Sequence, residues 1–504
     1  MDIAKYFANI RLDISKSNSL YHQIAIIISE KITNNEFPPG TKLPPERDLA
    51  TLFKVSRTTA INTYRLLEQQ GLVRTRVGSG TYVSDQPADA KQKEIPWKQL
   101  FKSHSQSYAS EVLREMVSVG YSADTISFAT GMPDPEFYPV EILADLFRTH
   151  IESLDKADFG YISTEGYYPL QNSIAKMLNE SGIISKKEEI MVVSGSQQGL
   201  YLLSKALLEP GDYVVTESPT FLGAIQAFQS AGAKILGIDT SGSHFLSSLE
   251  DYIIRYRPKL LYIMPTYQNP SGNVIQLKER QDLLNLAARH RLVIIEDDPY
   301  GNLYYGEVPP SSLKALDNYG GVVYLGTFSK ILIPGLKVGY IAAPPQLIKR
   351  IAFDKQYIDL SSNNITQWLT YKYLDEGYLG EHLTLLRREY KKRRDAMVRA
   401  LRRFCGDNVD FNIPDGGYYI WCRPREPVKV SKLLHEAAKA GVSFVPGDAF
   451  YAAAPPGTEF RLCFATHNEA VIAEGIKRLG KALSAAKKSG REILRTTVTG
   501  PPIV

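Results

Sequence analysis

This sequence has few cysteines and no long hydrophobic run. Its three cysteines, Cys405, Cys422 and Cys463, are an odd number without the spacing of a metal site, which argues against a disulfide framework. No apolar run, for example residues 25–29, approaches the length of a membrane-spanning helix. The first residues lack the layout of a signal peptide. We therefore predict a cytoplasmic protein with reduced thiols, no membrane partner and no metal.

The chain also lacks a strong net charge, since its formal charge is only +5 over 504 residues. A chain of this length exceeds what one hydrophobic core supports, so we expect at least two domains. Charge is unevenly distributed, because residues 41–80 hold seven lysines and arginines against three acidic residues. Such a basic segment is typical of a nucleic-acid interface, although a solvated surface would have the same charge.

The pattern of the same region favours the nucleic-acid interpretation. Residues 20–37 carry apolar side chains at helical spacing, and a Pro-Pro-Gly stop follows them. Residues 44–53 predict a second helix, and residues 57–71 a third, which Ser56 can cap. Residues 72–83 alternate around Gly-Ser-Gly and predict a hairpin. This order predicts a winged helix-turn-helix whose third helix enters the major groove, with a purely structural helical subdomain as the alternative.

Five stretches resemble the GntR-type winged-helix DNA-binding domain: LYHQI, PPGTKLPPERDLA, VSRTT, LEQQGLV and GSGTYV. The resemblance implies that this segment binds operator double-stranded DNA. Pro45 departs from the family, which usually has a small polar residue there, so the second helix loses a capping side chain. Two further arginines share one face of the wing and suit phosphates. The expected DNA-binding residues are therefore Arg47, Arg57, Thr58, Thr59, Arg74, Arg76, Gly78 and Gly80.

Composition divides the rest of the chain. After the DNA-binding domain at residues 13–84, residues 85–109 are rich in Lys, Gln, Ser and Pro and predict a flexible linker. Residues 110–485 alternate strand and helix patterns and predict an α/β body. Residues 486–504 form a tail to which we assign no role. The expected strands of the body are 190–195, 212–218, 259–265, 292–298, 321–328 and 338–343.

Polar residues gather where four of these strands end. SGSQQG, at residues 194–199, leads from a strand into a helix whose N-terminus would hold an anion such as phosphate. Asn269, Asp297 and Lys330 each follow another strand. Each motif alone is no more than a turn or a helix start. We expect the four motifs on consecutive strand ends of one sheet, and together they supply what pyridoxal 5′-phosphate requires, a lysine, a carboxylate for the pyridine nitrogen and an anion cradle.

These motifs resemble fold-type I aminotransferases across the body. The resemblance implies that Lys330 forms a Schiff base with the cofactor, that Asp297 pairs with the pyridine nitrogen, and that Asn269 and Tyr300 contact the ring hydroxyl. Lys330, Asp297 and Tyr300 are the expected catalytic residues. Arginine is usual where this chain has Lys337, so the grip on phosphate is expected to be weaker. The remaining expected contacts are Ser196, Gln197, Ser329 and Lys337 with phosphate, Phe221 with the ring, Tyr161 with the partner subunit's phosphate, and Arg461, Gly131 and Asn269 with substrate or effector.

A GntR-type domain joined to an aminotransferase-like body resembles the MocR family of transcription regulators over nearly the whole chain. The resemblance implies a cytoplasmic regulator, on the nucleoid when bound to DNA, in which an amine, amino acid or vitamer at the cofactor site controls operator binding. It also implies a head-to-tail homodimer with each DNA-binding domain over the partner's body. Two alternatives stay open: an active aminotransferase for an amino acid and a 2-oxo acid, and a DNA-binding protein whose body only dimerises. The sequence does not give the effector, the operator or the sign of regulation.

Overall fold

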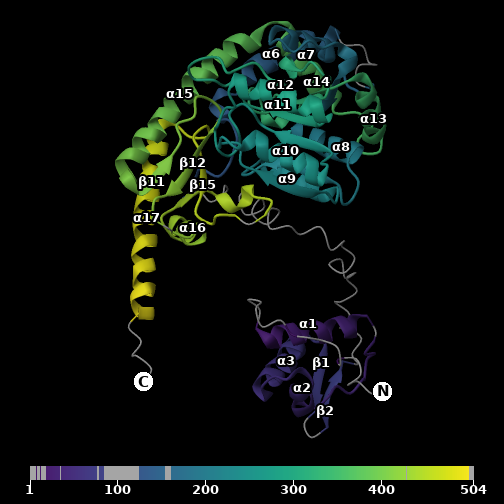
Figure 1. Cartoon of the computed structure of the whole chain (residues 1–504), viewed down its shortest axis with the longest axis vertical. Coiled ribbons are helices and arrows are strands. Elements are labelled where there is room, and N and C mark those ends of the chain that lie inside the picture. Colours follow the sequence, from purple (N-terminus) through teal and green to yellow (C-terminus); the bar gives the residue numbers. More distant parts are fainter. Residues whose placement is uncertain are drawn as a thin grey trace. The chain divides into compact units, whose positions relative to one another are not determined.

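The computed structural model describes residues 7, 12, 19–34, 36–76, 79–84, 124–153, 160–426, 428–453 and 455–498, with side chains up to residue 487. The chain divides into two compact units, residues 1–102 and 103–504, and each is described by itself (Figure 1). The expected linker at 85–109 lies outside the described residues, so its boundaries stay predictions. Within the described ranges, no helix is long and apolar enough to cross a membrane.

The smaller unit is a winged helix-turn-helix, as the sequence predicts. It consists of α1 (Leu20–Thr33), α2 (Glu46–Phe53), α3 (Arg57–Gln69) and an antiparallel hairpin of β1 (Val73–Arg76) and β2 (Gly80–Val83). Helix α2 begins directly after Pro45, which offers no capping side chain. Helix α3 is capped as expected, because the Ser56 side chain accepts a hydrogen bond from the Thr59 backbone N–H. The core of this unit includes Ile24, Ile28, Leu49 and Leu67, all fully buried.

The larger unit contains a seven-stranded sheet in which only β10 is antiparallel to its neighbours. All six strands expected for the body are present, and β6 is an addition. Strand β6, at the edge of the sheet, was not predicted because it begins with a lysine and a glycine interrupts its short apolar run. In spatial order the strands are β4 (Ile190–Val193), β10 (Gly339–Ala342), β9 (Val322–Thr327), β8 (Val293–Asp298), β7 (Leu260–Ile263), β5 (Tyr213–Glu217) and β6 (Lys234–Ile238).

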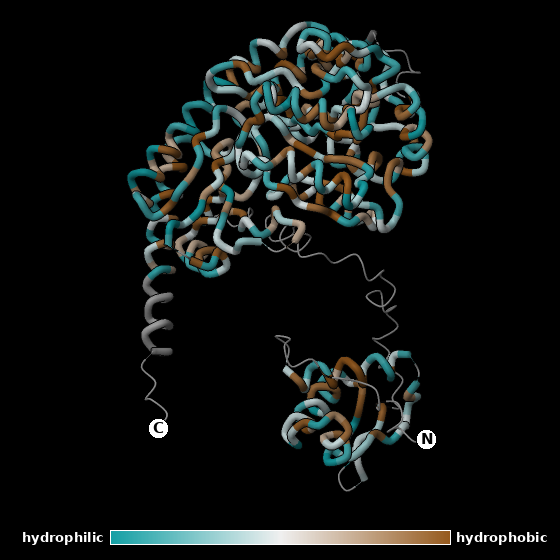
Figure 2. Tube along the Cα trace, viewed as in Figure 1, coloured by the Kyte–Doolittle hydropathy of each residue, from teal (hydrophilic) through white to brown (hydrophobic). Residues whose placement is uncertain are grey.

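Helices cover both faces of this sheet, because successive strand residues enter different hydrophobic clusters. Tyr262 belongs to the cluster that also buries α8 (Ser196–Leu207) and α9 (Leu222–Ser230). Ile263, the next residue, belongs to a second cluster with α10 (Phe245–Tyr256) and α11 (Leu277–His290). Figure 2 shows hydrophobic segments concentrated inside each unit. A sheet covered on both faces is open to ligands only at its strand ends.

The C-terminal part of the larger unit adds a second sheet. Four strands pair in the order β11 (Val409–Phe411), β12 (Tyr419–Pro424), β15 (Phe460–Cys463) and β14 (Val445–Pro446). Against them lie the long helices α15 (Tyr378–Phe404) and α17 (Glu469–Val498). Helix α17 runs through residue 485, the expected end of the body, so no change of element marks that boundary.

Candidate functional site

The carboxyl ends of three parallel neighbours, β7, β8 and β9, deliver Asn269, Asp297 and Lys330 to one cavity of about 500 Å³. The expectation of consecutive strands is wrong in one respect, because β10 lies between β9 and β4. The fourth motif still reaches the cavity through the start of α8. The expected residues that line the cavity are Gly131, Ser196, Gln197, Phe221, Asn269, Asp297, Tyr300, Ser329, Lys330, Lys337 and Arg461.

Lys330 points its amine into this cavity, where Nζ donates a hydrogen bond to the Gly131 carbonyl oxygen at 2.6 Å. Desolvation lowers the pKa of Lys330 to about 8. An ordinary lysine amine has a pKa near 10.4 and is almost fully protonated at neutral pH. The Lys330 amine is therefore far more available as a nucleophile than a surface lysine.

Asp297 is a buried carboxylate with one oxygen left unpaired. Its Oδ2 accepts a hydrogen bond from the Tyr262 hydroxyl at 2.7 Å, and Oδ1 has no hydrogen-bond partner among the described residues. Burial raises the pKa of Asp297 to about 7. A buried acceptor without a donor is costly, so the site calls for a ligand with a donor at this point. A protonated pyridine nitrogen fits this requirement.

The turn from β4 into α8 forms an anion cradle. Gly195 precedes the helix with φ of +83°, which glycine adopts without strain. A Cβ on Gly339, in the neighbouring strand, would lie 3.0 Å from the Gly195 Cα, so the two backbones need glycine to approach this closely. The Gln197 side chain donates to the Gly223 carbonyl at 2.9 Å, which leaves mainly backbone N–H groups for a phosphate. Lys337 lines the same cavity and adds positive charge.

Arg461 lines the same cavity as a buried cation. Its Nη1 donates to Asn269 Oδ1 at 2.8 Å and its Nη2 to the Ala129 carbonyl at 2.9 Å. Nε is buried without a hydrogen-bond partner, and no ion pair to Arg461 is found in the part of the chain that the structure describes. Burial of an unpaired charge is unfavourable, so a ligand carboxylate would offset that cost.

Tyr419 is a residue of this site that the sequence analysis missed. Its hydroxyl accepts a hydrogen bond from the Tyr300 hydroxyl at 3.0 Å, and its ring lies 4.0 Å from the Arg461 guanidinium carbon. A Cβ on Gly131 would overlap the Tyr419 hydroxyl, which explains the glycine there. The signal was an aromatic cluster, GGYYIW at residues 416–421, in a strand that was not predicted.

Tyr161 does not lie in this cavity. Its side chain is 88% exposed, so within one chain it cannot contact the site. Its expected contact with the phosphate of a partner subunit stays a prediction.

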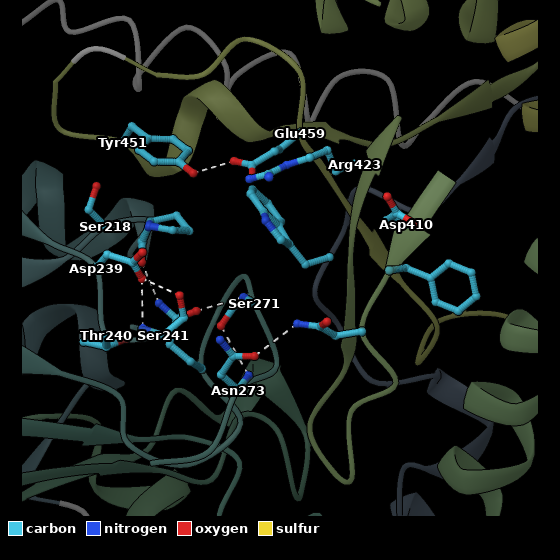
Figure 3. A pocket seen from close by; sticks show the side chains of 15 residues that line it. Ser218, Asp239, Thr240, Ser241, Ser271, Asn273, Asp410, Arg423, Tyr451 and Glu459 are labelled. Atoms are coloured by element: carbon cyan, nitrogen blue, oxygen red, sulfur yellow. Dashed lines mark hydrogen bonds and ion pairs between the residues drawn. The ribbon is translucent and has the colours of Figure 1, made fainter. Parts of the chain in front are cut away.

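A second cavity of about 340 Å³ is lined by loops of the large sheet and by residues of β11 and β12 (Figure 3). Its polar groups are largely satisfied by one another. Glu459 accepts hydrogen bonds from Arg423 and Tyr451, and Asn412 donates to Asn273 at 3.2 Å. Because the unpaired buried atoms of Asp297 and Arg461 belong to the first cavity, we regard that cavity as the ligand site.

The expected DNA-contacting residues of the small unit are mostly exposed. Arg47 and Thr58 are exposed, and Arg57 is held only by a surface ion pair with Glu46 at 3.2 Å. Thr59 is half-buried at the helix N-terminus, where Ser56 accepts a hydrogen bond from its backbone N–H. Because the ion pair between Arg57 and Glu46 is exposed and weak, Arg57 can exchange Glu46 for a DNA phosphate.

The hairpin adds a second basic surface to this unit. Arg74 and Arg76 both lie in β1, where Arg74 is half-buried and Arg76 is exposed, and Arg76 lies 5.4 Å from the Tyr82 ring. Lys42, which was not predicted, lies 5.7 Å from the same ring. Gly80 has φ of +117°, as a turn glycine should, and Gly78 is outside the described residues.

Comparisons with known proteins agree with both halves. The family profile described as aminotransferase class I and II matches residues 126–479, and that of bacterial regulatory proteins, gntR family, matches residues 20–83. The chain is 34% identical over 431 residues to an uncharacterized HTH-type transcriptional regulator, YisV, of Bacillus subtilis, covering 85% of this chain and 89% of that protein. It is 29% identical over 496 residues to the probable rhizopine catabolism regulatory protein MocR of Rhizobium meliloti, covering 97% and 99%.

Among solved structures, the body resembles LysN, the alpha-aminoadipate aminotransferase of Thermus thermophilus, in complex with N-(5′-phosphopyridoxyl)-L-leucine. The TM-score is 0.72 and the sequence identity 34%, over 78% of this chain and 100% of that one. Fold and cofactor class therefore agree with the cavity described above, and pyridoxal 5′-phosphate is the cofactor that its residues fit.

Proposed function

This chain belongs to the MocR family of DNA-binding regulators, in which a GntR-type domain precedes a class I and II aminotransferase domain, and we propose that it is a sensor. In this proposal an amine, an amino acid or a vitamer enters the cofactor cavity and changes how tightly the protein binds its operator. The observation that carries it is the single cavity in which an amine, an incompletely paired carboxylate and an incompletely paired guanidinium face one another.

The residues of the cavity divide the work of holding pyridoxal 5′-phosphate. When bound, the cofactor supplies an aldehyde that reacts with amines and a ring that withdraws electrons. Lys330 would bond to the aldehyde, and Asp297 would keep a proton on the ring nitrogen. Asn269 and Tyr300 would contact the ring hydroxyl, and Phe221 would pack on the ring. The start of α8, Ser329 and Lys337 would hold the phosphate.

Arg461 supports a ligand that carries a carboxylate. Its Nε is free for an acceptor, while its two terminal nitrogens are held by Asn269 and Ala129. A ligand amine that displaces Lys330 would release the lysine, whose pKa of about 8 lets it accept or give a proton near neutral pH. An amino acid is thus the ligand that would use both ends of the cavity.

We also propose a homodimer, because two helix-turn-helix units on one operator give the spacing that such domains read. A head-to-tail arrangement would bring Tyr161 to the partner's phosphate. It would also make operator binding depend on the conformation of the body. An effector shifts operator binding only by the difference in its affinity for the two arrangements of the dimer.

The second candidate function is an active aminotransferase that retains a DNA-binding domain. The complete set of Lys330, Asp297, Tyr300 and Arg461 in the cavity favours it. The two functions are separated by a DNA-binding titration with and without amino acids, run beside a transamination assay with a 2-oxo acid acceptor. Operator affinity that changes with ligand, with slow or absent turnover, supports the sensor. Brisk turnover with unchanging operator affinity would replace it with the enzyme.

A further inference from the structure

Helix α15 carries a high concentration of positive charge. Its 27 residues, Tyr378–Phe404, include nine lysines and arginines and three acidic residues. The excess of six exceeds the net charge of +5 for the entire chain, so the rest of the protein is close to neutral overall. Neither the cofactor cavity nor the helix-turn-helix accounts for this charge.

Six of the nine cations lie along one side of the helix, whereas Arg393 and Arg394 are buried. The side that faces the core also packs through apolar residues such as Leu386, Met397 and Leu401. The exposed cations recur at helical spacing over 16 residues, or about 22 Å of helix. Figure 1 shows α15 along one edge of the body. We name this surface the basic ridge and define it as Arg388, Lys391, Lys392, Arg399, Arg402 and Arg403, all exposed.

The two halves of the basic ridge differ in how they are neutralised. In the first half, Glu389 lies 2.7 Å from Arg388 and 2.9 Å from Lys392, and Asp395 lies 3.4 Å from Lys391. In the second half, the described residues supply no ion pair to Arg399, Arg402 or Arg403. Lys481, on the neighbouring helix α17, is also exposed.

We infer that the basic ridge binds the phosphate backbone of double-stranded DNA, in addition to the contacts of the helix-turn-helix. This inference rests on the proposed function as an operator-binding regulator. Duplex DNA carries one charge per about 1.7 Å of its axis, so a 22 Å length of duplex carries about 13 phosphate charges, and the ridge would face a part of them. Arginine suits this task because its planar fork binds phosphate oxygens in pairs.

The contact is independent of DNA sequence. No base-reading geometry is needed at an exposed row of long cationic side chains, and phosphate contacts position a protein without specifying bases. The ion pairs of Glu389 and Asp395 are exposed and exchange for phosphate at little cost. Because the helix-turn-helix tethers DNA to the same molecule, even weak binding at the ridge is strengthened by a high effective concentration.

The test compares two charge-reversal variants of the full-length protein with its cofactor. One is Arg399→Glu/Arg402→Glu/Arg403→Glu. The matched control is Arg255→Glu/Lys278→Glu/Arg289→Glu, which makes the same charge change at exposed residues of α10 and α11. Each is titrated at several salt concentrations with two 60-base-pair duplexes, one from the region upstream of the protein's own gene and one of mixed sequence. Far-ultraviolet circular dichroism and the cofactor absorbance check that both variants are folded.

The ridge variant should bind both duplexes at least tenfold more weakly than the control, by a similar factor. Its slope of log affinity against log salt should fall by about 2–3, since each lost phosphate contact contributes about 0.9. Arg57→Ala should instead lose affinity chiefly for the upstream duplex, so failure of the helix-turn-helix and failure of the ridge are distinguishable. Equal affinity and equal slope for the ridge variant and the control would overturn the inference. Selective loss of binding to phosphatidylserine vesicles, with DNA binding unchanged, would also overturn it. If the glutamate variant misfolds, Arg399→Gln/Arg402→Gln/Arg403→Gln decides by the same criteria.

Discussion

Gly131→Ala tests the geometry of the cofactor cavity from an unexpected side. A Cβ at this position would overlap the Tyr419 hydroxyl and lie 3.0 Å from the ring carbon that carries it. The ring must therefore move away, and its hydrogen bond from the Tyr300 hydroxyl, now 3.0 Å long, would break. Tyr419 also packs on Arg461, so the displacement reaches both ends of the cavity.

Loss of a buried hydrogen bond costs about 1–3 kcal/mol, which corresponds to about 5- to 150-fold weaker binding of an amino-acid ligand. The assay follows the cofactor absorbance of the purified protein during titration with amino acids. Tyr419→Phe in the Gly131→Ala background removes the overlapping hydroxyl, so it should restore part of the lost affinity even though it cannot restore the hydrogen bond. Wild-type affinity for Gly131→Ala, or a double variant no better than the single one, would refute this geometry.

Three further results are expected. Because the Lys330 pKa is about 8, about a tenth of its amine is neutral at pH 7, compared with less than a thousandth for an ordinary lysine. The rate at which the apoprotein takes up the cofactor, followed by absorbance, should therefore rise with pH and level off above pH 8. A rate that still rises at pH 10 would contradict this pKa. Arg461→Ala should keep the cofactor spectrum but weaken the binding of amino acids by about 2 kcal/mol in spectral titrations, far more than the binding of amines without a carboxylate. Equal losses of affinity for both ligand classes would show that Arg461 does not bind the carboxylate. In operator titrations Arg57→Ala should cost about 1–3 kcal/mol of binding free energy and relax base preference. Arg76→Ala should weaken binding to all sequences alike and lower the salt slope by about one. Unchanged binding in both variants would show that these arginines do not contact DNA.

The sequence predicted best where a short pattern is sufficient by itself. The helices of the head are fixed by local spacing and by the Ser56 cap, and the strands β4, β5 and β7 to β10 are apolar runs between turns. The smaller sheet was not predicted because its strands are short and carry polar residues, and because its pairing joins segments far apart in the chain. No change of element marks the predicted end of the body, because α17 continues past residue 485.

Within the site, strand ends indicated Asn269, Asp297 and Lys330, and the family resemblance supplied Gly131, Phe221 and Arg461, but neither indicated Tyr419. Asp297 and Lys330 stand at strand ends and were predicted. Tyr419 enters from the other sheet, and only the folded chain brings it next to Tyr300. Arg461 likewise donates to Asn269 and to the Ala129 carbonyl, and both partners are more than 190 residues away in the sequence.

The central claim is that ligand binding in the cofactor cavity changes the affinity of the protein for its operator, and Lys330→Ala tests it most directly. Operator binding by wild type and by this variant is titrated with and without an amino acid that changes the wild-type cofactor spectrum. We predict that both proteins bind the operator without ligand, and that only wild type changes its affinity when ligand is added. An operator affinity that ligand leaves unchanged in wild type, or changes equally in Lys330→Ala, would contradict the account.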